Sequence, residues 1–184
     1  MSALLRKHVT GFGRLAEEAG IQANQQLHCG RAPHHGEDAM STTAAPLRWG
    51  VIGLGWVSTD FTGPGMVESP GSQIFACLGS TPEKGQAFAG RFGVERVHAS
   101  LEAMMADPDV DAVYIATPNA LQREAVLAAA RPGKHVLCEN PFAMSDAEAR
   151  EMTQACERAG VVLRVAHQLR MEQAVVRARE LVRS

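Results

Sequence analysis

Gly53 and Gly55 are the residues of this sequence whose types and spacing first suggest chemistry. They follow a short apolar run, residues 48–52, that is expected to form a strand, and they precede a helix expected to begin at Trp56. Gly53 would allow a sharp turn, and Gly55, which lacks a Cβ, would let the backbone approach an anionic ligand. Unpaired N–H groups at a helix N-terminus attract phosphate. The pattern predicts a diphosphate-binding turn of the dinucleotide-binding kind, completed by Trp56 and Val57.

The position of a third glycine in this pattern is occupied by Ser58. That position serves close packing of the helix on the strand, and serine is small enough to be tolerated there. A glycine pair without context is also compatible with an ordinary strand-to-helix turn. The elements that surround the pair must therefore decide between the two interpretations.

Composition and charge indicate an ordinary globular protein. The chain has 184 residues, with 18 basic and 20 acidic residues and a net charge of −2. This balance gives no basic surface for nucleic acid or anionic membranes, and no apolar run is long enough to span a membrane. The four cysteines, Cys29, Cys77, Cys138 and Cys156, are scattered. We therefore expect a cytoplasmic protein without disulfides and without a zinc or other metal site.

Residues 1–46 differ from the rest of the chain. A weak helical periodicity near the N-terminus gives way to a polar stretch without pattern, and we expect a disordered or weakly helical tail. The stretch contains His28, Cys29, His34 and His35, but nothing around them predicts the rigid scaffold that a metal site needs. Met40 offers an alternative start for the protein.

A regular alternation of apolar strands and helices begins at Leu47. Helix starts are indicated by Thr81-Pro82-Glu83 and by capping-box patterns at residues 119–122 and 145–148. Six strands are expected, at residues 48–52, 72–78, 94–99, 111–116, 134–138 and 161–166. Such alternation predicts an α/β fold with a doubly wound, mostly parallel sheet, Rossmann-like, over residues 47–184. Ligands of such folds bind beyond the carboxyl ends of the strands, which is where the glycines lie.

Several motifs, in order along the chain, resemble those of one family of oxidoreductases. From residue 47 to residue 183 the sequence is similar to the N-terminal half of the glucose–fructose oxidoreductase, inositol dehydrogenase and rhizopine-catabolism (Gfo/Idh/MocA) family. The resemblance implies binding of NAD or NADP and oxidation or reduction of sugars, polyols or related carbonyl compounds. The matching segments are Gly53-Leu-Gly55, Thr81-Pro-Glu-Lys84, the run from Asp107 to Asn119, Gly133-Lys-His-Val-Leu-Cys-Glu139 and Ala166-His-Gln168.

The resemblance also implies a second, C-terminal domain that supplies substrate contacts and the surface through which family members usually form homo-oligomers. This sequence contains no counterpart of that domain, so we expect the chain to bind cofactor but not to turn over a substrate.

One departure from the family concerns proton transfer. The family usually has Glu-Lys-Pro after the fifth strand, whereas this chain has Glu139-Asn140-Pro141. An asparagine amide can orient a hydroxyl group but cannot accept its proton near neutral pH. Asn140 is therefore either a positioning group in an altered mechanism or a sign of a non-catalytic binding module, a pseudoenzyme. We assign no catalytic residue.

The resemblance places further cofactor contacts at the ends of the fourth and fifth strands. Thr117, Pro118 and Asn119 would lie where the cofactor crosses the fourth strand, with Gln122 replacing a histidine that many members have. Asn119 could instead simply cap its helix. The contacts after the fifth strand would be Glu139, facing the nicotinamide ribose, and Asn140.

The end of the second strand bears on the choice between NAD and NADP. NAD-binding proteins usually have a carboxylate there, but this chain has no acid before Glu83. Ser80, Thr81 and Lys84 could hold a 2′-phosphate, which slightly favours NADP over NAD. Alternatively, Ser80 and Thr81 only cap a helix. A methyltransferase-type loop for S-adenosylmethionine would share the glycine turn, but it leaves the Thr-Pro-Asn and Glu-x-Pro turns unexplained.

Overall fold

The computed structural model describes residues 45–168 and 173–183. The predicted tail, apart from residues 45 and 46, lies outside the described residues, and so do His28, Cys29, His34 and His35. The first strand of the structure begins at Leu47, and the domain bounds 1–46 and 47–184 stay a prediction.

The fold is built on a six-stranded sheet in the order β3-β2-β1-β4-β5-β6, with every pair of neighbouring strands parallel. The prediction of a Rossmann-like, doubly wound parallel sheet is confirmed. The strand order reverses at β1, which lies between β2 and β4, and this reversal defines where ligands bind in such folds. The strands are β1 (Leu47–Ile52), β2 (Ser72–Leu78), β3 (Arg96–Val97), β4 (Ala112–Ile115), β5 (His135–Glu139) and β6 (Leu163–Ala166).

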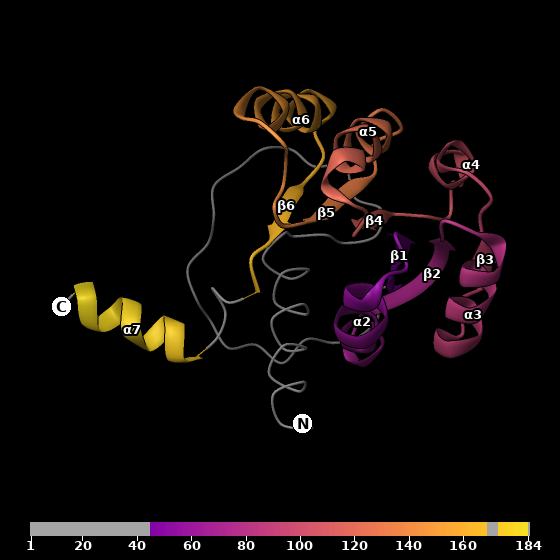
Figure 1. Ribbon diagram of the computed structural model, residues 1–184, viewed down its shortest axis with the longest axis horizontal. Helices are drawn as coiled ribbons and strands as arrows, with labels where there is room; N and C mark the ends of the chain where they lie inside the picture. Colours follow the sequence, from indigo (N-terminus) through magenta and orange to yellow (C-terminus); the bar gives the residue numbers. More distant parts are fainter. Residues whose placement is uncertain (1–44, 169–172, 184) are drawn as a thin grey trace.

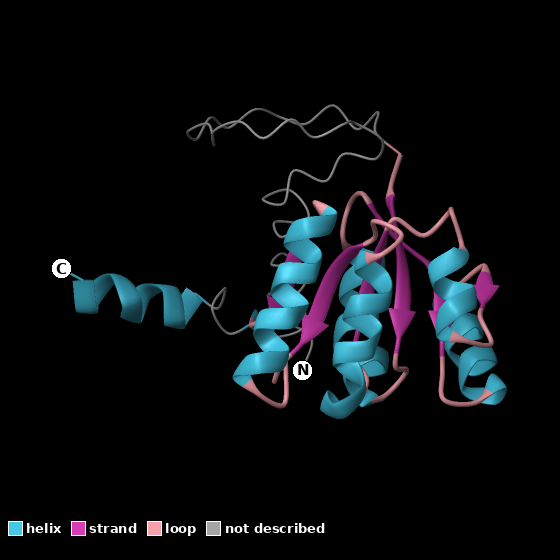
Figure 2. Cartoon of the chain, turned by 90° about the horizontal axis from the view of Figure 1, so that it is seen from above, coloured by secondary structure: helices cyan, strands magenta, loops and turns pink. Residues whose placement is uncertain are grey.

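Helices cover both faces of the sheet, as Figure 1 shows. The helices α4, α5 and α6 contribute buried residues to the core on one face, and α2 and α3 contribute to the core on the other. Figure 2 shows helices running alongside the strands in a separate layer. The helical segments are η1 (Val57–Thr62, a π-helix), α2 (Gly63–Glu68), α3 (Pro82–Phe92), α4 (Leu101–Ala106), α5 (Asn119–Ala130), α6 (Asp146–Ala159) and α7 (Gln173–Arg183).

Local capping signals fix both ends of α3 and of α6. The side chains of Thr81 and Ser145 accept hydrogen bonds from backbone N–H groups in the first turns of α3 and α6. Gly93 and Gly160 end the same helices in the left-handed conformation, with φ of 68° and 67°. These four predictions from the sequence are confirmed. They could be made from the sequence because each depends on residues within one helical turn.

One helix start differs from expectation. The capping box at residues 119–122 is wrong: Pro118 occupies the N-cap position of α5, and no side chain caps this helix. Asn119 is already inside the helix, so the interpretation of this residue as the cap is also wrong. After the glycine turn, the π-helix η1 passes directly into α2, which begins at Gly63 with Pro64 in its first turn.

A charged network closes the N-terminal edge of the sheet. Arg48 forms ion pairs with Asp109 (2.8 Å) and Asp111 (3.0 Å). Arg96 pairs with Asp109 (2.7 Å) and with the buried Asp107 (2.7 Å). The acidic motif that contributed to the family resemblance therefore joins the starts of β1, β3 and β4, far from the carboxyl ends where a ligand would bind.

A buried lysine, Lys134, and a half-buried histidine, His135, stabilise the same edge. The Lys134 ammonium donates to the carbonyl oxygens of Asp107 (2.6 Å) and Val110 (2.8 Å). His135 accepts a hydrogen bond at Nδ1 from the backbone N–H of Val162 (3.1 Å). Burial lowers the pKa of His135, partly opposed by the charge of Asp111, so the folded protein favours the neutral imidazole.

This environment predicts a pH-dependent stability. Because the folded pKa of His135 lies below the unfolded value of 6.5, its contribution is complete above that pH and declines as the pH falls below it. Protonation of Nδ1 also removes the acceptor for Val162, a loss of about 1 kcal/mol. We expect denaturant unfolding to show a smaller loss of stability between about pH 7 and pH 5 in His135→Asn, whose Oδ1 accepts without titrating. Equal pH dependence in the two proteins would contradict this assignment.

Candidate functional site

The ends of β1 and β4 meet at Gly53, which follows β1 in a conformation that favours glycine. Its φ is +90°, and a Cβ on this residue would lie 2.6 Å from the backbone carbonyl of Ala116. The N–H of Gly53 donates to the carbonyl of Leu78 (3.1 Å), and the N–H of Ala116 donates to Ile52 (2.8 Å). The sharp turn expected at Gly53 is therefore present, and it is held against two neighbouring strands.

Gly55 lies open at the surface of this turn. A Cβ placed on it would meet no atom within 4 Å, so the space above its backbone is free for a ligand. The N–H groups of Leu54 and Gly55 have no acceptor among the described residues, and the helical segment begins immediately afterwards, at Trp56. Free amides at the start of a helix form an anion-binding site.

Ser58 has a function that sequence analysis missed. Its side chain is buried, and its hydroxyl donates to the carbonyl of Gly53 (2.6 Å). The hydroxyl of Thr59 similarly donates to the carbonyl of Gly55 (2.8 Å). Replacement of the third glycine by serine therefore adds a hydrogen bond that fastens the helix to the glycine turn, instead of weakening their packing.

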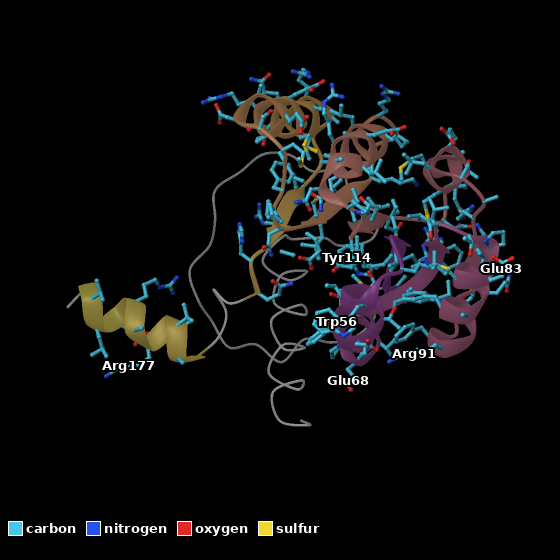
Figure 3. All side chains as sticks on the ribbon, viewed as in Figure 1. Trp56, Glu68, Glu83, Arg91, Tyr114 and Arg177 are labelled. Carbon is cyan, nitrogen blue, oxygen red and sulfur yellow. The ribbon has the colours of Figure 1, made fainter. Side chains whose placement is uncertain are left out.

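Trp56 and Val57 follow the turn. Trp56 is 67% exposed and packs edge-on against Phe61, with 4.4 Å between ring centroids. Figure 3 shows Trp56 beside α2. Val57 is half-buried at the start of η1. The sequence contains only one other tryptophan, Trp49, which is buried, so Trp56 is a natural fluorescent reporter for this site.

The end of β2 lies beside the glycine turn. A Cβ on Gly79 would lie 3.2 Å from the Leu54 side chain, which shows how closely the two segments approach. Beyond it, Ser80, Thr81 and Lys84 are exposed, and Lys84 Nζ donates to the hydroxyl of Ser80 (3.2 Å). The structure thus brings a cation, two hydroxyl groups and the N-terminus of α3 together at this end of the sheet.

The turn after β4 presents polar groups without partners. The hydroxyl oxygen of Thr117 is shielded from solvent and has no hydrogen-bond partner in the described part of the chain. Pro118 is exposed and Asn119 half-buried, and no side chain caps the start of α5. An orphaned hydroxyl and an uncapped helix beside the glycine turn are features that a polar ligand would satisfy.

Glu139, at the end of β5, is the buried carboxylate of the site. It accepts hydrogen bonds from the Tyr114 hydroxyl (2.7 Å), from Gln168 Nε2 (3.0 Å) and from the backbone N–H of Asn140 (3.2 Å). Burial and the charge of Glu139 raise the pKa of Tyr114, which keeps its hydroxyl protonated. Sequence analysis did not identify Tyr114, because an apolar strand gives no signal that one of its members bonds a carboxylate.

Asn140 and Gln122 make contacts within the protein. Asn140 Nδ2 donates to the carbonyl of Ala166 (2.7 Å), which ties the ends of β5 and β6 together. Gln122 is buried, and its amide nitrogen, oriented to suit its neighbours, donates to the carbonyls of Pro141 (2.8 Å) and Phe142 (3.1 Å). Gln122 therefore holds the segment after Glu139, and its predicted contact with a cofactor stays a prediction.

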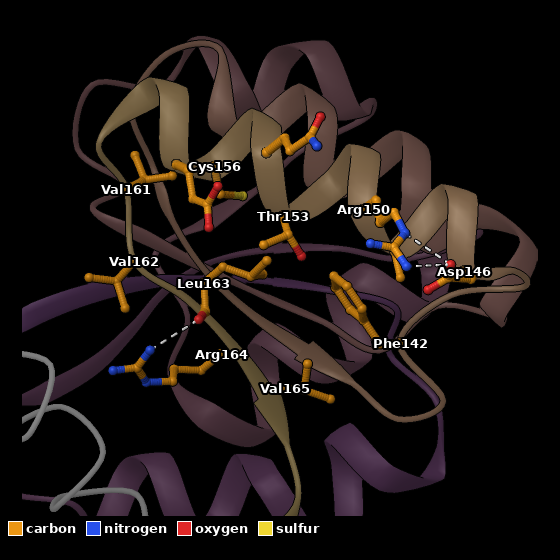
Figure 4. Close-up of a pocket in the computed structure, with 13 residues that line it drawn as sticks. Phe142, Asp146, Arg150, Thr153, Cys156, Val161, Val162, Leu163, Arg164 and Val165 are labelled. Carbon is orange, nitrogen blue, oxygen red and sulfur yellow. Dashed lines mark hydrogen bonds and ion pairs between the residues drawn. The ribbon is translucent and has the colours of Figure 1, made fainter.

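An open groove of about 810 Å³ lies elsewhere, between α6 and the edge strand β6. Figure 4 shows Phe142, Leu163 and Val165 along it, and a dashed ion pair between Asp146 and Arg150. None of the residues predicted to bind cofactor line this groove. The charged side chains that line it, such as Asp146, Arg150 and Arg164, are exposed.

The residues at the carboxyl edge fit a dinucleotide. Free amides after Gly53 suit a diphosphate, and the hydroxyls and lysine after β2 lie on one side of it. The groups after β4 and β5 lie on the other side, since the strand order places β2 and β4 on opposite sides of β1. No group of three or more metal-ligating side chains occurs in the described ranges, and no described helix is long and apolar enough to cross a membrane.

Comparison with known proteins agrees with this geometry. Residues 47–167 match the model of the GFO_IDH_MocA family, described as an oxidoreductase family with an NAD-binding Rossmann fold. The chain belongs to this oxidoreductase family. The predicted family and the predicted nicotinamide dinucleotide, NAD or NADP, are therefore confirmed.

Several relatives are named for reactions on sugars and related compounds. The chain is 44% identical to 1,5-anhydro-D-fructose reductase of Ensifer adhaerens over 67% of its own length and 37% of the relative's. It is 36% identical to the scyllo-inositol 2-dehydrogenase (NADP⁺) IolU of Bacillus subtilis, over 64% and 35% of the two chains. The sequence thus spans a little over a third of the length of these relatives.

Solved structures show the same relationship. KijD10, a 3-ketoreductase from Actinomadura kijaniata in complex with NADP, superposes with a TM-score of 0.71 at 27% identity, over 75% of this chain and 44% of the other. Aldose–aldose oxidoreductase from Caulobacter crescentus gives a TM-score of 0.70 at 34% identity, over 75% and 42%.

The free space above Gly55 provides a direct test of the cradle. In Gly55→Asp the new side chain meets no protein atom, but its carboxylate occupies the diphosphate position. Like charges forced together cost several kcal/mol, so we expect NADPH affinity to fall by at least about tenfold, measured by calorimetry. Gly90→Asp is the control, because Gly90 is also exposed and open but lies on α3 away from the turn. Equal affinities in the two variants would contradict the placement of the diphosphate.

Proposed function

We propose that this chain is the NAD(P)-binding domain of an oxidoreductase that acts on sugars, polyols or related carbonyl compounds. The observation that carries the proposal is the turn at Gly53 and Gly55, whose free amides lie beside the orphaned hydroxyl of Thr117. The substrate class is supported by relatives named for anhydrofructose, inositol and xylose. Because the chain covers 37% of the first of these relatives, the activity of a whole protein is itself part of the proposal.

The residues suggest how a cofactor would lie. The amides of residues 54–56 would hold the diphosphate, and the residues after β2 would hold the adenosine ribose. Thr117, Asn119 and Glu139 would hold the nicotinamide half. The nicotinamide would supply hydride transfer, while these residues would orient its ribose.

NADP is the preferred form in this proposal. Lys84 and the hydroxyls of Ser80 and Thr81 are exposed where a 2′-phosphate would lie, and the first carboxylate, Glu83, lies in the first turn of α3. Glu83 interacts with its own backbone N–H and with Thr81, which lower its pKa. Neighbouring structures in complex with NADP support the same preference.

Asn140 cannot accept the proton that a substrate hydroxyl loses during oxidation. Its amide does not titrate, and its nitrogen already donates to Ala166. We therefore assign Asn140 a positioning role and infer that a group other than Asn140 transfers the proton. The alternative, a non-catalytic binding module, is motivated by this replacement.

Ser80→Asp tests both the cofactor and its preference. A carboxylate at this position repels a 2′-phosphate and pairs with Lys84, so we expect NADPH affinity to fall about tenfold while NADH affinity is kept. Quenching of Trp56 fluorescence by bound NADPH gives the measurement. Ser145→Asp is the control, because this change only replaces one N-cap residue by another at the start of α6.

Two results would contradict the proposal at different levels. Unchanged NADPH affinity in Ser80→Asp would remove the preference for NADP. Failure of the unaltered chain to bind either NADPH or NADH at millimolar concentration would remove the proposed function.

A further inference from the structure

A chain of hydrogen bonds links the glycine turn to the carboxylate at the end of β5. The Thr62 hydroxyl, at the end of η1, lies 2.9 Å from the Tyr114 hydroxyl on β4. The Tyr114 hydroxyl lies 2.7 Å from Glu139 Oε1, and Gln168 Nε2 lies 3.0 Å from the same oxygen. Thr62, Tyr114 and Glu139 are all buried, at 3%, 0% and 9% exposure. Three separate segments of the chain therefore meet beneath the proposed cofactor site.

The direction of these hydrogen bonds is fixed by chemistry. An ionised carboxylate only accepts, so Tyr114 must use its single proton on Glu139. The distance between the Thr62 and Tyr114 hydroxyls does not by itself say which one donates. Because the proton of Tyr114 is used on Glu139, the Thr62 hydroxyl must donate to the oxygen of Tyr114. Removal of either hydroxyl breaks the chain: without the Tyr114 hydroxyl, the buried Thr62 hydroxyl loses this partner, and without the Thr62 hydroxyl, the Tyr114 oxygen loses its donor.

The two oxygens of Glu139 have different surroundings. Oε1 accepts from both Tyr114 and Gln168, whereas Oε2 accepts from the backbone N–H of Asn140 at 3.2 Å and from Asn140 Nδ2 only at 3.5 Å. No lysine, arginine or histidine of the described residues pairs with this carboxylate. Oε2 thus keeps capacity to accept a hydrogen bond from a ligand hydroxyl, while neutral donors hold Oε1 in place.

The π-helix connects this chain to the diphosphate cradle. It begins one residue after Trp56, its residue Ser58 donates to the carbonyl of Gly53, and its last residue is Thr62. A π-helical turn of this kind frequently lies at a functional site. The same turn therefore fixes the glycine backbone at one end and the ring hydroxyl of Tyr114 at the other.

We propose that Thr62 and Tyr114 are positioning residues that aim Glu139 Oε2 at a ribose hydroxyl on the nicotinamide side of the cofactor. This inference rests on the proposed function and deepens it. The two halves of the cofactor would then depend on different residues. The adenosine half is held by residues after β1 and β2, whereas the nicotinamide half depends on the hydrogen-bonded chain Thr62–Tyr114–Glu139.

The test compares two ligands on each variant by calorimetry. NADP⁺ carries both ribose groups, whereas 2′,5′-ADP carries only the adenosine half. We expect Tyr114→Phe to weaken NADP⁺ binding about five- to tenfold and to leave 2′,5′-ADP binding unchanged, since only the first ligand reaches Glu139. Thr62→Val should act in the same direction, and Thr62→Ser, which restores a hydroxyl, should recover the affinity.

Two further variants separate positioning from a general loss of stability. Lys134→Met removes buried hydrogen bonds at the opposite edge of the sheet, so it should lower the melting temperature without changing either affinity. In Glu139→Gln, the added change Tyr114→Phe should have no further effect on NADP⁺ binding if Tyr114 acts through Glu139.

The outcomes are distinguishable. If both ligands bind the unaltered chain but Tyr114→Phe weakens them equally, or weakens neither, the positioning role is wrong and the proposed function stands. Additive effects of Tyr114→Phe and Glu139→Gln would overturn the role as well. If the unaltered chain binds neither ligand, the proposed function itself fails.

Discussion

The close approach of the β1 end to the β4 end is the constraint on which the site depends. At Gly53 the backbone passes so near the carbonyl of Ala116 that a Cβ would lie 2.6 Å from it. The turn lies against the backbone of Thr117, the next two amides have no acceptor among the described residues, and the helical segment follows from Trp56. The buried hydroxyl of Ser58 then locks the turn by donating to the carbonyl of Gly53. A larger residue at position 53 would force these two strands apart.

The N-terminal and carboxyl ends of the strands have different roles: the first stabilises the sheet, and the second is open to a ligand. The N-terminal edge is closed by ion pairs of Arg48 and Arg96 with three aspartates, so it has little capacity left for a ligand. The carboxyl edge instead keeps open space above Gly55 and an unpartnered hydroxyl at Thr117. Motifs that identify the family therefore include segments that only hold the sheet together as well as segments that form the site.

Sequence patterns predicted what depends on neighbouring residues and missed what depends on distant ones. The caps at Thr81 and Ser145 were predictable because donor and acceptor lie within one helical turn. The bonds of Tyr114 to Thr62 and Glu139 join residues 52 and 25 positions apart, and no local pattern encodes them. The capping box at residues 119–122 failed for the same reason, because Gln122 is drawn to the segment after β5.

The most direct test of the account is an amide chemical-shift titration of the chain with NADPH. The central claim is that the N–H groups of Leu54, Gly55 and Trp56 hold the diphosphate. The account predicts that these three amides shift most, followed by the segments after β2 and β4. Shifts confined to the groove between α6 and β6, with residues 54–56 unaffected, would contradict it.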